Sequence, residues 1–304
     1  MNTIELPQSY PALPLERWED TKKTLHLFLQ IVGKIRLALC PKANHWWHAP
    51  LYVSVRGLTT RPIPVDDMVF EIEFDFLHHV LSIKTSKGDH ELLKLTDVSV
   101  SQFYRNVFNT LNKLGIDVQI KAKPYDIVSK LPFESNHTDK SYDAEYVGRY
   151  FNALVSINTV FEQFRAKFFG KSTPVQLYWH HFDLVVTRFS GKVAPEKDWP
   201  TNVEREAYSH EVVSFGFWPG DEVVREAAFY AYLYPEPDDL LNQKLAPAAA
   251  SWNTDPGYAM AFLPYDSVRK SRNPSDDIMS FLESVYTAGC AVGGWDAGCF
   301  KKQA

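Results

Sequence analysis

The strongest constraint on the fold of this 304-residue chain is that helix-type and strand-type patterns follow one another in the same order twice. Apolar residues recur every three or four positions from about 18 to 40, which predicts a helix that Pro41 ends. At 70–76, Phe and Ile alternate with acidic residues, which predicts a strand with one dry and one acidic face. A second helix is expected over 99–115. Strands are expected at 46–56, 70–76, 80–84, 91–95 and 117–121.

The second series begins after a stretch rich in Pro, Ser, Asn and charge at 123–141, which we interpret as a connector. It starts with a helix over about 143–169 and ends with a helix that Ser275 can cap. Between them, strands are expected at 175–189, 210–218, 227–234 and 258–263. We therefore predict an α+β fold of two similar helix–antiparallel sheet–helix halves packed as one compact unit. The expected division is an N-terminal half at 1–122, the connector at 123–141 and a C-terminal half at 142–304.

One local match supports an internal duplication. Trp47-His48 precedes Arg56 by the same spacing that separates Trp179-His180 from Arg188. The match covers three residue types, so chance or shared strand composition remains open as an explanation. If the halves are related, we expect a ligand pocket where they meet, because ligand sites favour such seams.

Composition excludes several classes of protein. Hydrophobic residues make up 45% of the chain and charged residues 23%, as in globular proteins and unlike disordered ones. The net charge of -5 argues against an electrostatic grip on phosphate backbones, so no nucleic acid is expected as a partner. Aromatic residues reach 14%, which suits large cores and apolar pockets but indicates no particular chemistry.

The location expected for the protein is the cytoplasm. Cys40, Cys290 and Cys299 are too few for a disulfide framework and form no C-x-x-C pair. The first seven residues lack the basic and apolar regions of a signal peptide, and no run of about 18 apolar residues occurs, so no membrane association is expected. The oligomeric state stays open.

Motifs spread over nearly the whole chain resemble those of a known family. They are TLH and QIVGK within 24–34, NHWWH at 44–48, LYV at 51–53, RGLTT at 56–60, FDF at 74–76, FDL with TRFSG at 182–191, and AYSHEV with GFWPG at 207–220. In these motifs the chain resembles an uncharacterised bacterial protein family, the domain of unknown function number five-nine-nine-six. The resemblance implies no activity, ligand or catalytic residue, so a function has to be argued from the side chains.

The segment 44–48 is the densest cluster of polar and aromatic residues. His45 and His48 would point to opposite faces of a strand, but in a turn they could converge as metal ligands. No standard metal-binding spacing surrounds them. The alternative is that His48 packs beside the indoles of Trp46 and Trp47 and His45 bonds to the backbone.

Charged residues also lie on strands that composition predicts to be buried. Glu211 shares a strand face with Val and Phe, and a buried carboxyl group can serve acid–base chemistry or pair with an arginine such as Arg56 or Arg188. Asp183 and Arg188 fall on opposite faces of one strand, and each needs a partner, because an unpaired buried charge costs several kcal/mol. Arg56 shares its face with Tyr52 and His48, a group that could bind a carboxylate or phosphate or form a wet outer face.

Our leading hypothesis is a small-molecule-binding protein, and the chemistry that these residues suggest is action on an anionic molecule by histidine–carboxylate acid–base catalysis. Arg56 and Arg188 would hold the anion, His48 and His210 would exchange protons, and Glu211 or Asp183 would orient them. The walls of this site would be formed by Tyr52, Trp46, Trp47 and Trp179.

Two alternatives remain. No cofactor is predicted, but a divalent metal held by His45, His48 and His210 would make the protein a metal-dependent enzyme. A non-catalytic binding or assembly protein is the other alternative, in which the charged strand residues are structural ion pairs.

Overall fold

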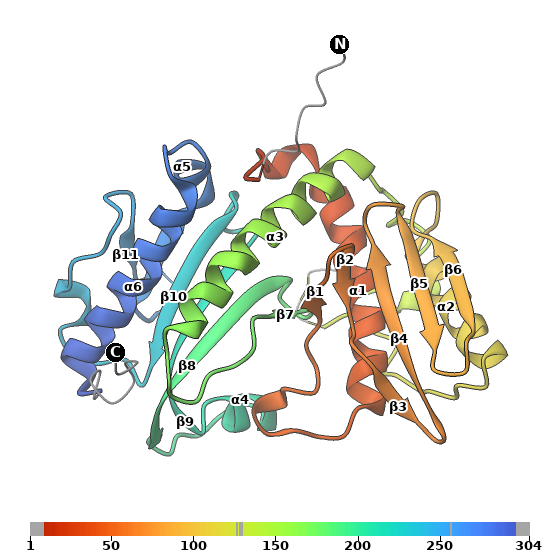
Figure 1. Ribbon diagram of the computed structural model, residues 1–304, viewed down its shortest axis with the longest axis horizontal. Coiled ribbons are helices and arrows are strands. Elements are labelled where there is room, and N and C mark those ends of the chain that lie inside the picture. Colours follow the sequence, from red (N-terminus) through yellow and green to blue (C-terminus); the bar gives the residue numbers. More distant parts are fainter. Residues whose placement is uncertain (1–8, 126, 128–129, 256, 296–304) are drawn as a thin grey trace, which may run out of the picture. The chain divides into compact units, whose positions relative to one another are not determined.

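The computed structural model describes residues 9–125, 127, 130–255 and 257–295, and it has an α+β fold with two antiparallel six-stranded sheets (Figure 1). Backbone contacts divide the chain into two units. The first unit comprises Glu16–Phe151 and Leu177–Phe182, and the second comprises the chain up to Leu15, Asn152–Gln176 and the chain from Asp183 onward. The predicted connector at 123–141 lies inside the first unit, and the division falls within a helix, at Asn152.

The first unit contains a meander sheet in the order β1-β2-β4-β5-β6, with β3 added beside β4. The helices of this unit are η1 (Leu15–Arg17), α1 (Glu19–Leu39), η2 (Asn44–Trp46), α2 (Val100–Lys113) and η3 (Phe133–Ser135). Its strands are β1 (Tyr52–Val53), β2 (Gly57–Thr59), β3 (Ile63–Val65), β4 (Met68–Asp75), β5 (Val80–Thr85) and β6 (His90–Lys94).

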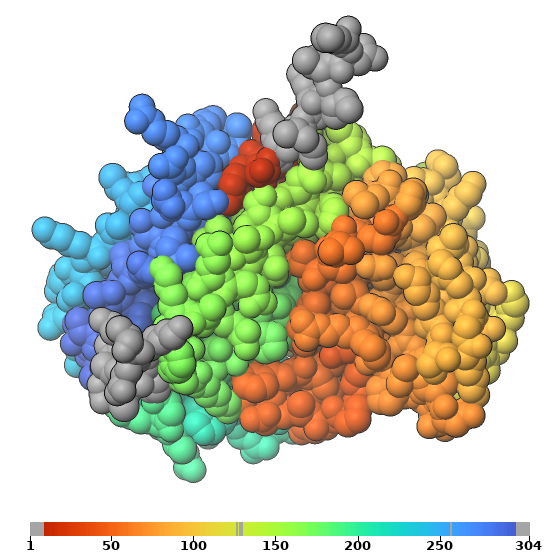
Figure 2. All heavy atoms as spheres, viewed as in Figure 1, coloured from red at the N-terminus to blue at the C-terminus, as the bar shows by residue number. Residues whose placement is uncertain are grey.

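One face of the first sheet is dry and the other is polar, as the alternation in β4 predicts. Phe70, Ile72 and Phe74 are buried, and Phe103 of α2 stacks on Phe28 of α1 at 4.0 Å between ring centroids. Helices α1 and α2 thus cover the apolar face. None of the described helices lies over the opposite face, and the strands of this sheet are visible at the surface in the space-filling view (Figure 2).

The second unit contains a sheet in the order β11-β12-β10-β9-β8-β7. The strands of this sheet are β7 (Gln176–Tyr178), of which Leu177 and Tyr178 belong to the first unit, β8 (Asp183–Val193), β9 (His210–Trp218), β10 (Ala228–Tyr234), β11 (Ser251–Asn253) and β12 (Met260–Pro264). Its helices are α3 (Ala144–Ala166), which begins in the first unit, α4 (Asn202–Ala207), η4 (Leu240–Asn242), α5 (Tyr265–Arg269) and α6 (Pro274–Gly293).

Helices α3 and α6 lie across one face of this second sheet (Figure 1). Phe164 of α3 packs edge-on against Phe215 of β9, and Phe161 packs against Phe229 of β10. The opposite face carries polar and tyrosine side chains. None of the described helices is long and apolar enough to cross a bilayer.

Two predicted strands are wrong because the backbone turns where side-chain type alone suggested extension. Within 46–56 only Tyr52–Val53 is a strand, because His45 and Trp46 have positive φ angles of 53° and 60°. Within 175–189 the chain is broken by Phe182, with φ of 63°, into β7 and β8. The Trp-His pairs of both halves therefore lie outside strands.

Smaller differences occur at two other predicted elements. The expected strand at 117–121 has no regular structure. Helix α6 starts at Pro274, a residue suited to the first helical position, and Ser275 bonds to the Tyr10 hydroxyl instead of capping the helix. Ser99, in contrast, caps α2 in a reciprocal capping box with Gln102, as expected.

Candidate functional site

The most exposed group of interacting charged side chains that involves a predicted site residue is built around Arg56 in the first unit. Strands β2 and β4 pair with Gly57 opposite Asp75, which places Arg56 beside the Asp75 carboxylate. Arg56 Nε and Nη2 donate to Asp75 Oδ2 at 2.8 and 2.7 Å. A side chain at Gly57 would put its Cβ 1.9 Å from the Phe74 carbonyl oxygen, so this close pairing requires glycine.

Asp75 also holds a histidine that the sequence analysis did not select. Its Oδ1 accepts the backbone N–H groups of Leu77 and His78, both at 3.0 Å. His78 Nδ1 lies 3.0 Å from Asp75 Oδ2 and also faces Arg56 Nη2. Burial opposes ionisation of Asp75, but the bonds from His78, Arg56 and the backbone outweigh it and lower the pKa of this carboxyl group to about 2.

Asp75 is buried, whereas the two side chains that it holds, Arg56 and His78, are accessible to a ligand. The carboxylate of Asp75 is 9% exposed, whereas the side chains of Arg56 and His78 are 35% and 68% exposed. A buried anion therefore holds a guanidinium and an imidazole side by side at the surface. Next to them, His79 Nδ1 lies 3.1 Å from the Tyr142 hydroxyl, and burial lowers the pKa of His79 and raises that of Tyr142.

The NHWWH segment forms a packed turn. His45 and His48 are both buried, at 5% and 7% exposure, and the His48 Nδ1 atom accepts the Ala43 N–H at 3.2 Å. The ring of Trp46 stacks on His48, and Trp47 packs against His45. Within the part of the chain that the structure describes, no group of three or more His, Cys, Asp or Glu residues could hold a metal ion.

Tyr52 and Trp179 are predicted wall residues that make other contacts within the first unit. The Tyr52 ring packs against the guanidinium of Arg61 at 3.4 Å. The indole of Trp179 occupies the space beside Gly33 on α1, where a Cβ would lie 2.2 Å from its ring, and its Nε1 donates to Ala49 O at 3.0 Å.

A buried histidine that was not selected from the sequence holds the Trp179-His180 turn in place. His26 Nε2 donates to the carbonyl oxygens of Trp179 and His180 at 2.9 and 3.1 Å. Burial, helped by the charge of Lys22, lowers the pKa of His26 to about 4, so the ring is neutral near pH 7. Its neighbours one helical turn away, Lys22 and Gln30, are polar, so the helical pattern gave no signal that His26 is buried.

In the second unit Asp183 begins β8 and is 5% exposed. The Tyr230 hydroxyl donates to its carboxylate, and the tyrosine ring lies over Gly216, the residue between them in the sheet. Burial and the Asp183 charge raise the pKa of Tyr230 well above its usual value. Tyr232 continues the row and shares a hydrogen bond of 2.9 Å with Tyr208.

Arg188 is locked inside the second unit, at 3% exposure. Its Nη2 donates to the carbonyl of Phe164, two residues before the end of α3, and this carbonyl also accepts the Lys167 N–H at 3.2 Å. Its guanidinium lies 3.4 Å from the Phe164 ring centroid and 4.4 Å from that of Tyr286. Burial lowers the pKa of Arg188 to about 10. The side chain is thus a helix cap packed among rings.

The two predicted carboxylates of the second unit do not converge. Glu211 accepts the Ser190 hydroxyl at 2.7 Å, and His210 Nδ1 lies 3.1 Å from Ser209 Oγ. Leu184 pairs with Phe217 at one end of the β8–β9 ladder and Phe189 with Val212 at the other. Asp183 and Glu211 are therefore roughly 20 Å apart along the strands. The strand pairing therefore does not bring the two carboxylates together.

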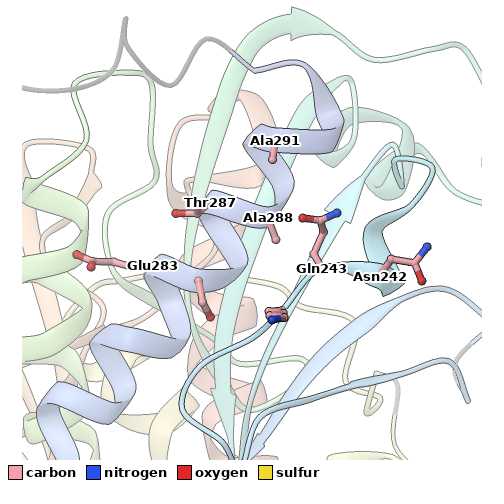
Figure 3. A pocket seen from close by; sticks show the side chains of 8 residues that line it. Asn242, Gln243, Glu283, Thr287, Ala288 and Ala291 are labelled. Carbon is pink, nitrogen blue, oxygen red and sulfur yellow. The ribbon is translucent and has the colours of Figure 1, made fainter.

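Two hollows open beside α6 in the second unit. The larger, about 490 Å³, lies between α6 and the segment after η4, where Gln243 and Ala288 flank it (Figure 3). Glu283 at its rim is paired with Lys167. The smaller, about 170 Å³, includes Glu211 in its wall. No other predicted site residue lines either hollow.

Comparison with known proteins identifies a family and nothing more. The chain matches the model described as "Family of unknown function (DUF5996)" over residues 10–302. No curated protein and no solved structure matches it.

Proposed function

The chain belongs to the DUF5996 family, whose function is unknown, and we propose that it binds an anionic small molecule at Arg56 and exchanges a proton with it through His78. The observation that carries this proposal is the side-by-side placement of the two exposed cationic or polarisable groups on the carboxylate of Asp75. A carboxylate or phosphate ligand is the chemistry that a guanidinium recognises best.

The hydrogen bonds of His78 support its role in proton exchange. Both of its close side-chain partners face Nδ1, and two-thirds of the ring is exposed, which leaves Nε2 for a ligand. Asp75 stays ionised down to about pH 2, so a carboxylate oxygen lies 3.0 Å from His78 Nδ1 throughout the neutral range. Arg56 stands beside the ring and would neutralise the charge of the bound anion.

This site replaces the hypothesis based on residues of both halves and retains only Arg56 from it. Arg188 is occupied as a helix cap, and His48 packs among indoles, so neither supports the earlier assignment. A cytoplasmic location remains part of the proposal on the sequence grounds given above.

A second candidate is a non-catalytic binding or assembly role. It is favoured by the acidic row on the open face of the first sheet, where each carboxylate has a partner within the unit. Glu71 accepts from Thr59, Glu73 accepts from Ser54 at 2.6 Å, and Asp75 pairs with Arg56.

Titration with inorganic phosphate and with acetate tests the proposal. In protein labelled in its histidine rings, we expect the His78 NMR signals to shift and to reach saturation as either anion is added. The affinity obtained from this titration should be at least tenfold weaker in the Arg56→Gln variant, a loss of about 1.4 kcal/mol of binding free energy. Arg105→Gln changes an exposed arginine on α2 and should leave the titration unchanged.

Proton exchange is tested separately with His78→Gln. This variant should retain folding and lose any turnover of a substrate found by screening anionic metabolites, whereas His137→Gln should retain it. If phosphate moves the exposed His137 as much as His78, or Arg56→Gln binds normally, the proposed site is wrong.

A further inference from the structure

The small hollow beside Glu211 has the chemistry of a site for a cation. It is walled by apolar side chains from the ends of three elements, together with one carboxylate. The apolar lining consists of Val212, Leu233, Pro235, Pro237, Val292, Gly293 and Trp295. Glu211 accepts a neutral hydroxyl from Ser190, and among the described residues it has no cationic partner within salt-bridge distance.

The end of α6 adds negative potential to the same hollow. Val292 and Gly293 are the last residues of this 20-residue helix, and the C-terminal end of a helix carries about half a negative charge on its unsatisfied carbonyls. No basic residue lies in the last turn of α6 to offset it. Outside α6, the Lys192 ammonium of β8 donates to Gly294 O at 3.1 Å, so one cation already lies near this end of the helix and would compete with a bound one.

The size and the walls limit the ligand. A cavity of about 150 Å³ accommodates a benzene-sized group, so about 170 Å³ fits one ring or a short branched chain. The indole of Trp295 in the wall can receive a cation or pack on a ring. An anion would face both Glu211 and the helix end, and a neutral ligand would leave the carboxylate without a counterion.

We propose that the hollow between the C-terminal end of α6, the start of β9 and the end of β10 is a binding site for a small arylalkyl or alkyl ammonium ion, with Glu211 as its counterion. The site lies wholly in the second unit and shares no residue with the Arg56 site. Its existence therefore does not depend on the function proposed above.

Calorimetry on the full chain tests the site with phenethylamine, in a buffer free of Tris and imidazole. We expect saturable millimolar binding of phenethylamine, and at least tenfold weaker binding of its neutral analogue 2-phenylethanol and of phenylacetate. The Glu211→Gln variant keeps the shape of the wall and should weaken phenethylamine binding at least tenfold.

Two further variants keep the test decisive. Glu283→Gln removes a carboxylate that α6 places in the other hollow, and it should bind phenethylamine as the unaltered chain does. Lys192→Met removes the competing ammonium and should strengthen binding, by about threefold for an exposed charge. Equal binding of 2-phenylethanol, unchanged binding by Glu211→Gln, or no binding of phenethylamine would each overturn the proposal.

Discussion

The two units contain the same series of elements, a long helix, a short strand, an antiparallel meander and a closing helix, yet they use arginine in opposite ways. The same interval along the chain separates Glu19 from Glu145, Leu51 from Leu177 and Gly57 from Asp183. Leu51 and Leu177 also bond to each other through both backbone groups, at 2.9 and 2.8 Å. This interval differs from the one that relates the two Trp-His pairs, and the internal duplication stays a prediction.

The difference lies in what surrounds each guanidinium. Arg56 precedes β2 and meets a carboxylate at the surface, whereas Arg188 lies inside β8 and meets a helix carbonyl and aromatic rings. An arginine held by a carboxylate at an open edge can release part of its hydrogen-bonding capacity to a ligand. A guanidinium that is buried against a helix end and aromatic rings has no such capacity left. Of these two arginines, only Arg56 is therefore available to bind a ligand.

The largest expected effect is on Arg188. The Arg188→Met variant removes one of the two donors to the Phe164 carbonyl, the other being the Lys167 N–H, and removes the guanidinium from three rings, so we expect the free energy of unfolding to fall by about 3 kcal/mol. Arg56→Met removes a partly exposed pair and should cost about 1 kcal/mol or less. Urea denaturation of both variants measures the difference, and equal losses would remove the contrast between the two arginines.

A smaller effect on stability is expected from replacing a glycine by alanine in each of the two long helices, α1 and α3. Gly33→Ala in α1 drives a methyl group into the Trp179 ring and should lower the free energy of unfolding by about 2 kcal/mol. Gly148→Ala in α3 meets nothing within 4 Å and should raise it by about 0.5–1 kcal/mol, because alanine favours the helix. The thermal midpoints of the two variants should move in opposite directions. A neutral Gly33→Ala would show that the indole does not need this space.

The last effect depends on pH. The pKa of Asp75 in the folded chain, about 2, lies below the unfolded value of about 3.9, so its ionised form stabilises the fold above that value. The advantage of the unaltered chain over Asp75→Asn should be about 1–2 kcal/mol above pH 5 and should vanish as the pH falls through 2. Denaturation curves between pH 2 and 7 measure it, and an advantage that grows in acid would contradict the assigned hydrogen bonds.

Much of the fold follows from local patterns, because burial imposes them directly. The alternation of Phe70, Ile72 and Phe74 with acidic residues places β4, and the apolar stripe of 18–40 places α1. The same reasoning fails at His45 and Phe182, where tertiary packing imposes a positive φ that bulky side chains rarely adopt. The aromatic residues around both positions are typical of strands, which is why the sequence predicted strands there.

The site was less accessible to sequence reasoning, because its parts are joined by strand pairing. Arg56 could be selected as an exposed cation, but its partner depends on the register that puts Gly57 opposite Asp75 across the intervening β3 segment. His78 enters only through the turn that Asp75 stabilises. Asp183 and Glu211 looked similar in sequence, and only the β8–β9 register places them at opposite ends of the sheet.

Modification with phenylglyoxal, a reagent for exposed guanidinium groups, tests the contrast between the two arginines most directly. In the native protein, mass spectrometry of peptides should show rapid modification of Arg56, protection of Arg56 by inorganic phosphate, and no modification of Arg188. Modification of Arg188 at the rate of Arg56, or modification of Arg56 that phosphate does not slow, would contradict the account.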